Sequence, residues 1–318
     1  MKISFIVTYY NQKNFVKDSL ASILAIDFPC NYEILIGDDG STDGTVDEIK
    51  RFCSKYPNII KYFVMPRDNN ITYDSILRVS ANRLNALKHA TGDYVMFLDG
   101  DDFYCDKDFV KLALEQFYKN NNIVACAFGY ENYFPKGNKR KECFLPKVGL
   151  FDVKKYVERV YTPSGAVVFR NIFDTEKIKL LEKNKIFDDN LITIFALQFG
   201  KLYCFKDVIY TYRQCDGSSW NSKNDAEKNL LNAMDFYIIS TVSPKFKKEL
   251  LKRQWFSINQ IYRHRHVLYR LIVCEKYINQ LKENNDVFVL SLLMWNKISL
   301  FDKLKTVIKY WLLKWRVV

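Results

Sequence analysis

Four short apolar runs of β-forming residues are separated by segments with helical periodicity in the first hundred residues of the chain. In the intervening segments, apolar residues recur every three or four positions, as they do on one face of a helix. Such alternation is typical of a parallel sheet whose connecting helices cover its faces. The sequence therefore predicts an α/β fold. The strand-like runs are 3–8, 32–37, 59–65 and 94–98.

The alternating pattern changes at about residue 221, beyond which the chain reads as wholly helical. We therefore expect a first domain over residues 1–221 and a separate C-terminal helical region over 222–318. The later part of the first domain is expected to hold further strands and helices. The strands are expected at 123–128, 166–169 and 202–212, and the helices at 106–120 and 190–199.

The net charge of +12 lies almost entirely in the C-terminal tail. The last 78 residues hold 16 Lys plus Arg against 5 Asp plus Glu, whereas residues 1–240 carry only +1. A nucleic-acid-binding domain needs a basic surface on the fold itself. No nucleic-acid partner is therefore expected, and the tail is a separate basic part of the chain.

Part of this tail combines an apolar stripe at helical spacing with basic residues on its other faces. A helix of this kind can lie in a membrane interface, where anionic lipid contributes roughly 1 kcal/mol for each basic residue near the surface. We expect it to bind the inner face of the cytoplasmic membrane. The alternative is docking on the first domain or on a second subunit, which would make an oligomer. The stripe comprises Ile298, Phe301, Leu304, Ile308, Trp311, Leu312 and Trp315.

Cysteine usage and hydropathy predict a cytoplasmic protein that associates peripherally with the membrane. The eight cysteines include no C-x-x-C pair, and several lie in apolar runs, so buried free thiols in a reducing compartment are expected. The first strand leads at once into polar residues, without the features of a signal peptide. The longest apolar stretch, 287–295, is far shorter than the ~20 residues of a membrane-spanning helix.

Two clusters of aspartates follow predicted strands. Asp38 and Asp39 begin GDDGSTDGT, and FLDGDDF contains Asp99, Asp101 and Asp102. Ligands of open α/β sheets bind at the carboxyl ends of the strands, and Mg²⁺ or Mn²⁺ takes carboxylate and phosphate oxygens. If the second segment is extended, Asp99 and Asp101 point the same way and can hold a cation with a phosphorylated substrate.

Each aspartate cluster also has a purely structural interpretation. Residues 41–44 have the turn and capping chemistry of a strand-turn-helix junction, and Asp43 can satisfy free amides of the following helix. The second cluster can be a solvated acidic loop, because D-x-D is frequent by chance. Two adjacent carboxylates repel each other unless a ligand or cation separates their roles. This repulsion favours a functional role for Asp39.

The motifs together resemble family 2 of the inverting GT-A glycosyltransferases. The resemblance rests on ISFIVTYYNQ at the first strand, on DDGSTDGT and on ATGDYVMFLDGDDF. It implies a GT-A, Rossmann-like, mostly parallel nucleotide-binding sheet flanked by helices. Residues 1–105 would form the nucleotide-binding half and 106–221 the acceptor half of a catalytic domain.

The resemblance implies roles for residues of the nucleotide-binding half. Thr8 and Tyr10 would line the base pocket, with Tyr10 stacked on the uracil, and Asp39 would accept the hydrogen of base N3. Asp99 would face the ribose, and Asp101 would bind the Mn²⁺ or Mg²⁺ that bridges the diphosphate.

Arg83 holds the arginine position of the family segment that precedes ATGDY and would approach the nucleotide. The surrounding residues 82–86, NRLNA, depart from the family pattern Arg-Asn-x-Gly. This departure leaves the contact made by Arg83 open.

The acceptor half would supply the catalytic base and a further cation. Asp189, in FDDN, takes the place of the family's acidic residue at the start of a helix and would be the base, although Asp188 or Asp189 could instead cap that helix. Arg213, in YTYR, would meet the diphosphate, or alternatively form a salt bridge at a sheet edge. The segment 162–165 would border the acceptor pocket.

The resemblance implies an enzyme that transfers a hexose or N-acetylhexosamine from a UDP-sugar. The acceptor would be a hydroxyl of a cell-surface glycan, such as lipopolysaccharide, capsule or a teichoic-type polymer, in glycan or lipid-linked form. Transfer would proceed by metal-assisted direct displacement with inversion. The alternatives are a metal-dependent sugar nucleotidyltransferase and a non-enzymatic basic module that binds membrane or nucleic acid.

Overall fold

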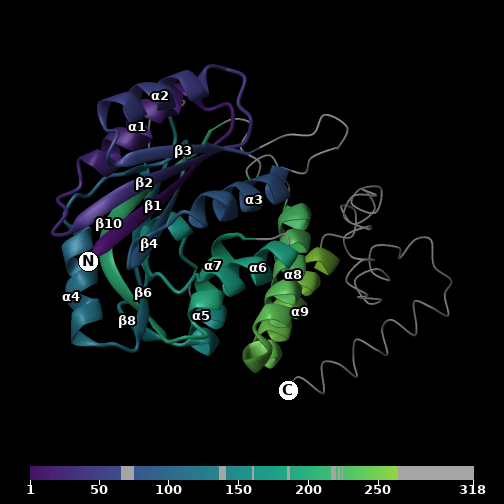
Figure 1. The fold of residues 1–318 in the computed structure, drawn as a ribbon. Coiled ribbons are helices and arrows are strands. Elements are labelled where there is room, and N and C mark those ends of the chain that lie inside the picture. The colour runs from purple at the N-terminus through teal and green to yellow at the C-terminus, as the bar shows by residue number, and fades with distance from the viewer. Residues whose placement is uncertain are drawn as a thin grey trace. The chain divides into compact units, whose positions relative to one another are not determined.

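The computed structural model divides by its internal contacts into two compact units, Met1–Asn221 and Ser222–Val318, which are described separately (Figure 1). The first unit is a large sheet with helices, and the described part of the second is helical. The structure describes residues 1–65, 75–135, 141–159, 161–184, 187–215, 220, 223 and 225–263.

The first half of the sheet is parallel. Its strands are β1 (Lys2–Tyr9), β2 (Asn31–Asp38), β3 (Ile60–Val64) and β4 (Tyr94–Asp99). They lie in the order β3-β2-β1-β4, and each neighbouring pair is parallel. These are the four apolar runs of the sequence, which confirms the predicted α/β fold.

The second half of the sheet is mixed. Beyond β4 the order continues through β9 (Val167–Arg170), β6 (Ile123–Tyr133), β10 (Lys201–Arg213) and β5 (Phe103–Tyr104). Strand β9 is antiparallel to both β4 and β6, whereas β10 is parallel to β6. Two short strands that the apolar pattern did not indicate pair with this half: β7 (Lys141–Phe144) with β6, and β8 (Gly149–Phe151) with β10.

Helices cover both faces of the sheet (Figure 1). One face carries α1 (Lys13–Leu24), α2 (Thr45–Lys55) and α4 (Phe109–Lys119), and the other carries α3 (Ser75–Leu87), α6 (Thr175–Asn184) and α7 (Asp189–Ala196). The helix α5 (Val153–Arg159) and the short 3₁₀ helix η1 (Ser164–Ala166) precede β9.

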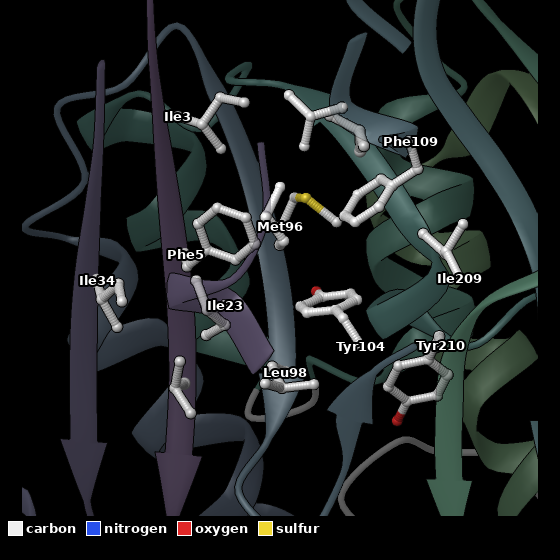
Figure 2. Close-up of a cluster of buried hydrophobic side chains, with 14 of the residues drawn as sticks. Ile3, Phe5, Ile23, Ile34, Met96, Leu98, Tyr104, Phe109, Ile209 and Tyr210 are labelled. Atoms are coloured by element: carbon white, nitrogen blue, oxygen red, sulfur yellow. The ribbon is translucent and has the colours of Figure 1, made fainter. Parts of the chain in front are cut away.

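The core on the α1–α4 face is aromatic at its centre (Figure 2). The ring of Phe5 meets Tyr104 edge-on with centroids 6.0 Å apart, and Tyr104 stacks on Phe109 at 5.3 Å. Met96 of β4 lies among them. Alternate residues of a strand point to opposite faces, so the even-numbered Ser4 and Thr8 of β1 serve the other face.

The described part of the second unit consists of α8 (Asp225–Val242), the 3₁₀ helix η2 (Pro244–Phe246) and α9 (Lys247–Arg263). Helices α8 and α9 pack against each other. The amphipathic stripe predicted beyond residue 297 lies outside the described residues. In the described part of the chain, no helix has the length and apolarity to cross a membrane.

The seven cysteines among the described residues are free thiols. Cys126 and Cys204 are buried, as expected, but Cys105 and Cys143 are exposed. The prediction of buried thiols was wrong for these two, because Cys105 follows the two-residue strand β5 and Cys143 lies on β7, a short strand that pairs with β6 off the main order of the sheet. Cys274 lies outside the described residues.

A buried carboxylate ties β1, β2 and the turn before β4 together. Glu33, only 5% exposed, accepts hydrogen bonds from Lys2 Nζ (2.6 Å), Ser4 Oγ (2.6 Å), and the backbone N–H (2.8 Å) and hydroxyl (2.9 Å) of Thr91. Burial alone would raise the pKa of Glu33, but these bonds lower it below the ordinary value of 4.5.

Glu33→Gln is expected to lower the free energy of unfolding at pH 7 by roughly 2 kcal/mol, because it removes charge-assisted hydrogen bonds inside the fold. A lowered folded-state pKa stabilises above the unfolded value, and this contribution is lost as the pH falls through the folded value. The difference between variant and wild type should therefore shrink below pH 4.5. Denaturant titrations across this range measure it.

Glu48→Gln is the control, since it removes a pair with Arg51, whose side chain is 74% exposed. Exposed pairs of this kind contribute about 0–1 kcal/mol. Equal stability of Glu33→Gln and wild type at pH 7 would contradict the structural role of Glu33.

Candidate active site

The carboxyl ends of three parallel strands bring the predicted nucleotide-binding residues together. In the register of the sheet, Thr8 of β1 lies beside Gly37 of β2 on one side and beside Asp99 of β4 on the other. The Thr8 hydroxyl donates to Asp99 Oδ1 at 3.3 Å. Asp39 follows directly after β2, and its N–H donates to the Tyr9 carbonyl at 3.0 Å. Thr8, Asp39 and Asp99 thus share one edge of the sheet.

The turn after β2 separates structural aspartates from Asp39. Asp38 is fully buried and accepts from the N–H groups of Gly40 (3.1 Å) and Ser41 (3.0 Å), and Asp43 accepts from the N–H of Thr45 at the start of α2 (2.9 Å). The interpretation as a strand-turn-helix junction therefore accounts for Asp38 and Asp43. It does not account for the side chain of Asp39.

Asp39 forms an ion pair with Arg78 of α3, and both side chains are buried. Sequence reasoning did not single out Arg78. The spacing could have indicated it, because Arg78 lies four residues before Asn82 and therefore on the same face of one helix. In the structure this face meets the end of β2, where Asn82 Nδ2 donates to the Gly37 carbonyl at 2.9 Å. Tyr10, the predicted stacking residue, follows directly after β1 and is 45% exposed.

Arg83 connects the two halves of the predicted site. Its NH2 group donates to both carboxylate oxygens of Asp99, at 2.7 and 2.8 Å. Its NH1 group lies 3.5 Å from Asp189 Oδ1 and donates to the Phe187 carbonyl at 3.4 Å. Burial by itself would lower the pKa of Arg83, but the charges of Asp99 and Asp189 raise it above its ordinary value. The guanidinium therefore stays charged between two carboxylates.

The two aspartates that begin α7 have different functions in the structure. Asp188 is the N-cap, and its Oδ1 accepts from the Leu191 N–H at 2.8 Å. Asp189 instead accepts from Ser164 Oγ at 2.6 Å and from the Tyr161 hydroxyl at 3.2 Å. Burial is the main cause that raises the pKa of Asp189. Asp188 is therefore the residue that caps the helix, whereas the carboxylate of Asp189 contacts Ser164 and Arg83.

The segment that follows β4 is a turn, so the expected extended arrangement of Asp99 and Asp101 was wrong. The Asp102 N–H donates to the Asp99 carbonyl at 2.9 Å, and the Gly100 N–H donates to the Thr8 carbonyl at 2.9 Å. The turn packs so closely on Tyr9 that a Cβ at Gly100 would lie 2.1 Å from its ring. The carboxylates therefore take separate partners.

Asp102 and Arg213 connect this turn to β10. Asp102 is fully buried, accepts from the Arg213 N–H at 2.7 Å and receives a hydrogen bond from the Tyr210 hydroxyl. The Arg213 side chain donates from Nε to the Asp101 carbonyl at 2.8 Å and pairs with Asp18 at 3.2 Å. The salt-bridge alternative for Arg213 is thus the arrangement in this structure, and sequence reasoning missed the support from Tyr210.

Asp101 is the carboxylate of this turn that suits a divalent cation. Burial and the neighbouring charge of Asp99 raise its pKa to about 6, although the charge of Arg213 acts in the opposite direction. Among the described residues, no cluster of three or more His, Cys, Asp and Glu side chains could hold a metal ion. A single carboxylate such as Asp101 could hold Mg²⁺ together with phosphate oxygens and waters, which commonly supply most ligands of this ion.

Comparison with known proteins places the chain in a family. The family model "Glycosyl transferase family 2" matches residues 4–176, more than half of the chain, and this range includes the edge formed by Thr8, Asp39 and Asp99. The chain therefore belongs to glycosyl transferase family 2, and it is a glycosyltransferase.

Its relatives include proteins of the same class. An uncharacterised glycosyltransferase of Mycoplasma pneumoniae is 27% identical over 80% of this chain and 86% of its own length. Another, from Rickettsia conorii, is 34% identical over 51% of this chain, which spans only 24% of that longer protein. The poly-beta-1,6-N-acetyl-D-glucosamine synthase of Staphylococcus epidermidis is 29% identical over 64% of this chain and 46% of its own length.

A solved structure shares the fold. The crystal structure of S. aureus TarS, residues 1–349, in complex with UDP-GlcNAc superposes with a TM-score of 0.61. The match covers 89% of this chain and 80% of that one at 21% sequence identity. The likeness supports the GT-A arrangement of the sheet and its helices.

Asp188→Ala is expected to lower the free energy of unfolding by about 1 kcal/mol, because it removes the side-chain cap of α7. Asp188→Ser keeps a capping oxygen and should recover most of this loss. Asp189 caps no backbone N–H, so Asp189→Ser should recover nothing relative to Asp189→Ala, because any loss in these two variants comes from the contacts with Arg83 and Ser164. Thermal unfolding of the four variants tests the division of roles, and recovery by Asp189→Ser equal to that by Asp188→Ser would contradict it.

Proposed function

We propose that the chain transfers a hexose or N-acetylhexosamine from a UDP-sugar to a hydroxyl of a cell-surface glycan, by a single displacement with inversion. The observation that carries the proposal is the position of Arg83, whose guanidinium contacts both Asp99 at the end of β4 and Asp189 at the start of α7. Donor-side and acceptor-side carboxylates are thereby held next to each other.

Similar proteins support the choice of donor and product. The TarS structure that shares this fold contains UDP-GlcNAc, and a relative from Staphylococcus epidermidis is named as a synthase of poly-beta-1,6-N-acetyl-D-glucosamine. Both names concern N-acetylglucosamine, and the second names a polymer of it as the product. A UDP-N-acetylhexosamine is therefore the first donor to test.

The nucleotide is proposed to bind along the shared strand edge. Tyr10, exposed beyond β1, stacks on the uracil, and Thr8 lies beneath it. Asp39 accepts the base N3 hydrogen next to its ion pair with Arg78. Asp99, held by Arg83 and 36% exposed, keeps part of its carboxylate free for the ribose hydroxyls.

Asp189 is proposed as the catalytic base. It takes the proton of the acceptor hydroxyl while that oxygen forms a bond to the anomeric carbon, and the bonding pair of the breaking C–O bond leaves with the diphosphate. A base needs a pKa nearer the working pH than a free carboxylate has, and burial moves the pKa of Asp189 in that direction. Arg83 and Ser164 keep its orientation fixed.

Asp101 is proposed to hold the divalent cation, Mn²⁺ or Mg²⁺, with the diphosphate oxygens. A cation there would stabilise the negative charge that develops on the leaving group. Arg213, expected at the diphosphate, acts in this proposal through the backbone of Asp101, to which it donates. The Arg213 guanidinium itself forms an ion pair with Asp18.

The proposed function includes a division of the chain into two regions, a location at the membrane and a lipid-linked acceptor. Residues 1–221 would form the catalytic domain, and the basic region 222–318 would bring it to the inner face of the cytoplasmic membrane, where a lipid-linked acceptor is found. Membership of the glycosyltransferase family favours this function over a nucleotidyltransferase or a non-enzymatic module.

Asp101→Asn is expected to weaken UDP binding in the presence of Mn²⁺ at least tenfold, whereas Asp189→Asn should bind UDP normally and lose transfer by about 10²–10⁴-fold, the usual contribution of a general base. Calorimetry with UDP and Mn²⁺ and a donor-turnover assay separate the two effects. Asp27→Asn, which changes a 66% exposed carboxylate, is the control. Full turnover in either site variant would refute its role.

The transfer rate at saturating donor should fall as the pH is lowered through the pKa of Asp189, because only the ionised form accepts a proton. Arg83 lowers this pKa by its positive charge. Arg83→Met is therefore expected to move the acid limb of the rate profile to higher pH, while Arg83→Lys, which keeps the charge, should leave it nearly in place. An unmoved acid limb in Arg83→Met would show that Asp189 does not set it.

A further inference from the structure

The two carboxylate oxygens of Asp189 have partners of different kinds. Oδ1 accepts from Ser164 Oγ at 2.6 Å and lies 3.5 Å from the Arg83 guanidinium. Oδ2 accepts from the Tyr161 hydroxyl at 3.2 Å. The Oδ1 interactions are shorter or charged, whereas the contact of Tyr161 with Oδ2 is a long hydrogen bond from a neutral hydroxyl.

The partners also differ in how freely they can move. Ser164 is 2% and Arg83 6% exposed, so neither can leave Oδ1 without opening the packed interior. Tyr161 is 53% exposed. Its neighbour Thr162 is buried, so the packed backbone of this segment lies next to a tyrosine that keeps about half of its surface in contact with solvent. Replacing the hydrogen-bond partner of Asp189 therefore requires less free energy at Oδ2 than at Oδ1.

We propose that the Tyr161 hydroxyl occupies the position of the acceptor hydroxyl on Asp189 Oδ2, and that the acceptor displaces it. This inference rests on the proposed function and identifies where the acceptor enters. The acceptor hydroxyl then donates to Oδ2 in place of Tyr161, and its proton passes to Oδ2 as its oxygen bonds to the anomeric carbon. The C–O bond to the diphosphate breaks, and the diphosphate keeps the electron pair. Oδ1 stays bound to Ser164 throughout.

The arrangement protects the donor while no acceptor is present. Water is also a hydroxyl donor, and a water molecule on Oδ2 would be activated to hydrolyse the sugar nucleotide. The tyrosine hydroxyl fills this place on Oδ2, so a water molecule cannot take it. An acceptor held by additional contacts can compete with Tyr161 better than water does.

Hydrolysis of UDP-GlcNAc and a panel of other UDP-sugars, with Mn²⁺ and without any acceptor, tests this inference. Tyr161→Phe keeps the ring and frees Oδ2, so hydrolysis should rise by roughly threefold to tenfold, a factor of the size that one hydrogen bond accounts for. A merely structural role for the hydroxyl, which would orient Asp189, predicts a fall instead. Ser164→Ala should produce that fall, because it releases Oδ1.

Two further variants make the test specific. In the double variant Tyr161→Phe with Asp189→Asn the increase should disappear, because it requires the carboxylate. Tyr118→Phe, which changes a 91% exposed tyrosine of α4, should hydrolyse the donor as wild type does. Unchanged or reduced hydrolysis in Tyr161→Phe would overturn the inference and leave the proposed function intact. Absence of UDP binding to the wild type in calorimetry with Mn²⁺ would overturn the proposed function and the inference with it.

Discussion

A single buried guanidinium determines the organisation of the active site. Arg83 is almost fully enclosed, and a buried cation is tolerable only when carboxylates and hydrogen-bond acceptors surround it. Asp99 supplies two of these contacts and Asp189 a third, from parts of the chain about ninety residues apart. The three groups together keep one excess negative charge. The separation of Asp99 from Asp189 is thus set by the reach of one arginine.

The turn that bears Asp101 depends on packing more than on its own sequence. Gly100 lies against the ring of Tyr9, where no side chain would fit, and Asp102 is anchored to β10 by Tyr210 and the backbone of Arg213. Arg213 also donates from Nε to the Asp101 carbonyl, which ties the backbone of the turn to β10. A short acidic motif thereby acquires a fixed shape from two strands that are distant in sequence.

The sequence was sufficient for the parallel strands and for the place of the aspartates, and insufficient for the short strands β7 and β8 and for the partners of the site residues. The four apolar runs predicted the parallel strands, the strand ends predicted that Asp39 and Asp99 would lie at the carboxyl end of the sheet, and the family resemblance added Thr8. The ion pair of Asp39 with Arg78, the support of Asp102 by Tyr210 and the contact of Tyr161 with Asp189 join separate elements. Such contacts depend on how helices pack on the sheet, which local periodicity does not specify. The turn after β4 was mistaken for extended chain because D-x-D carries no signal for the close approach of Gly100 to Tyr9.

The antiparallel strand β9 lies between β4 and β6, although it comes much later in the chain than either. During synthesis on the ribosome, the outer edge of β4 stays unpaired until β9 has emerged, and an unpaired edge is a template for association with other chains. The ion pair of Arg83 with Asp189 likewise cannot form until Asp189 has been synthesised. The nascent polypeptide therefore passes through an interval in which its first four strands lack the strand that pairs with the outer edge of β4.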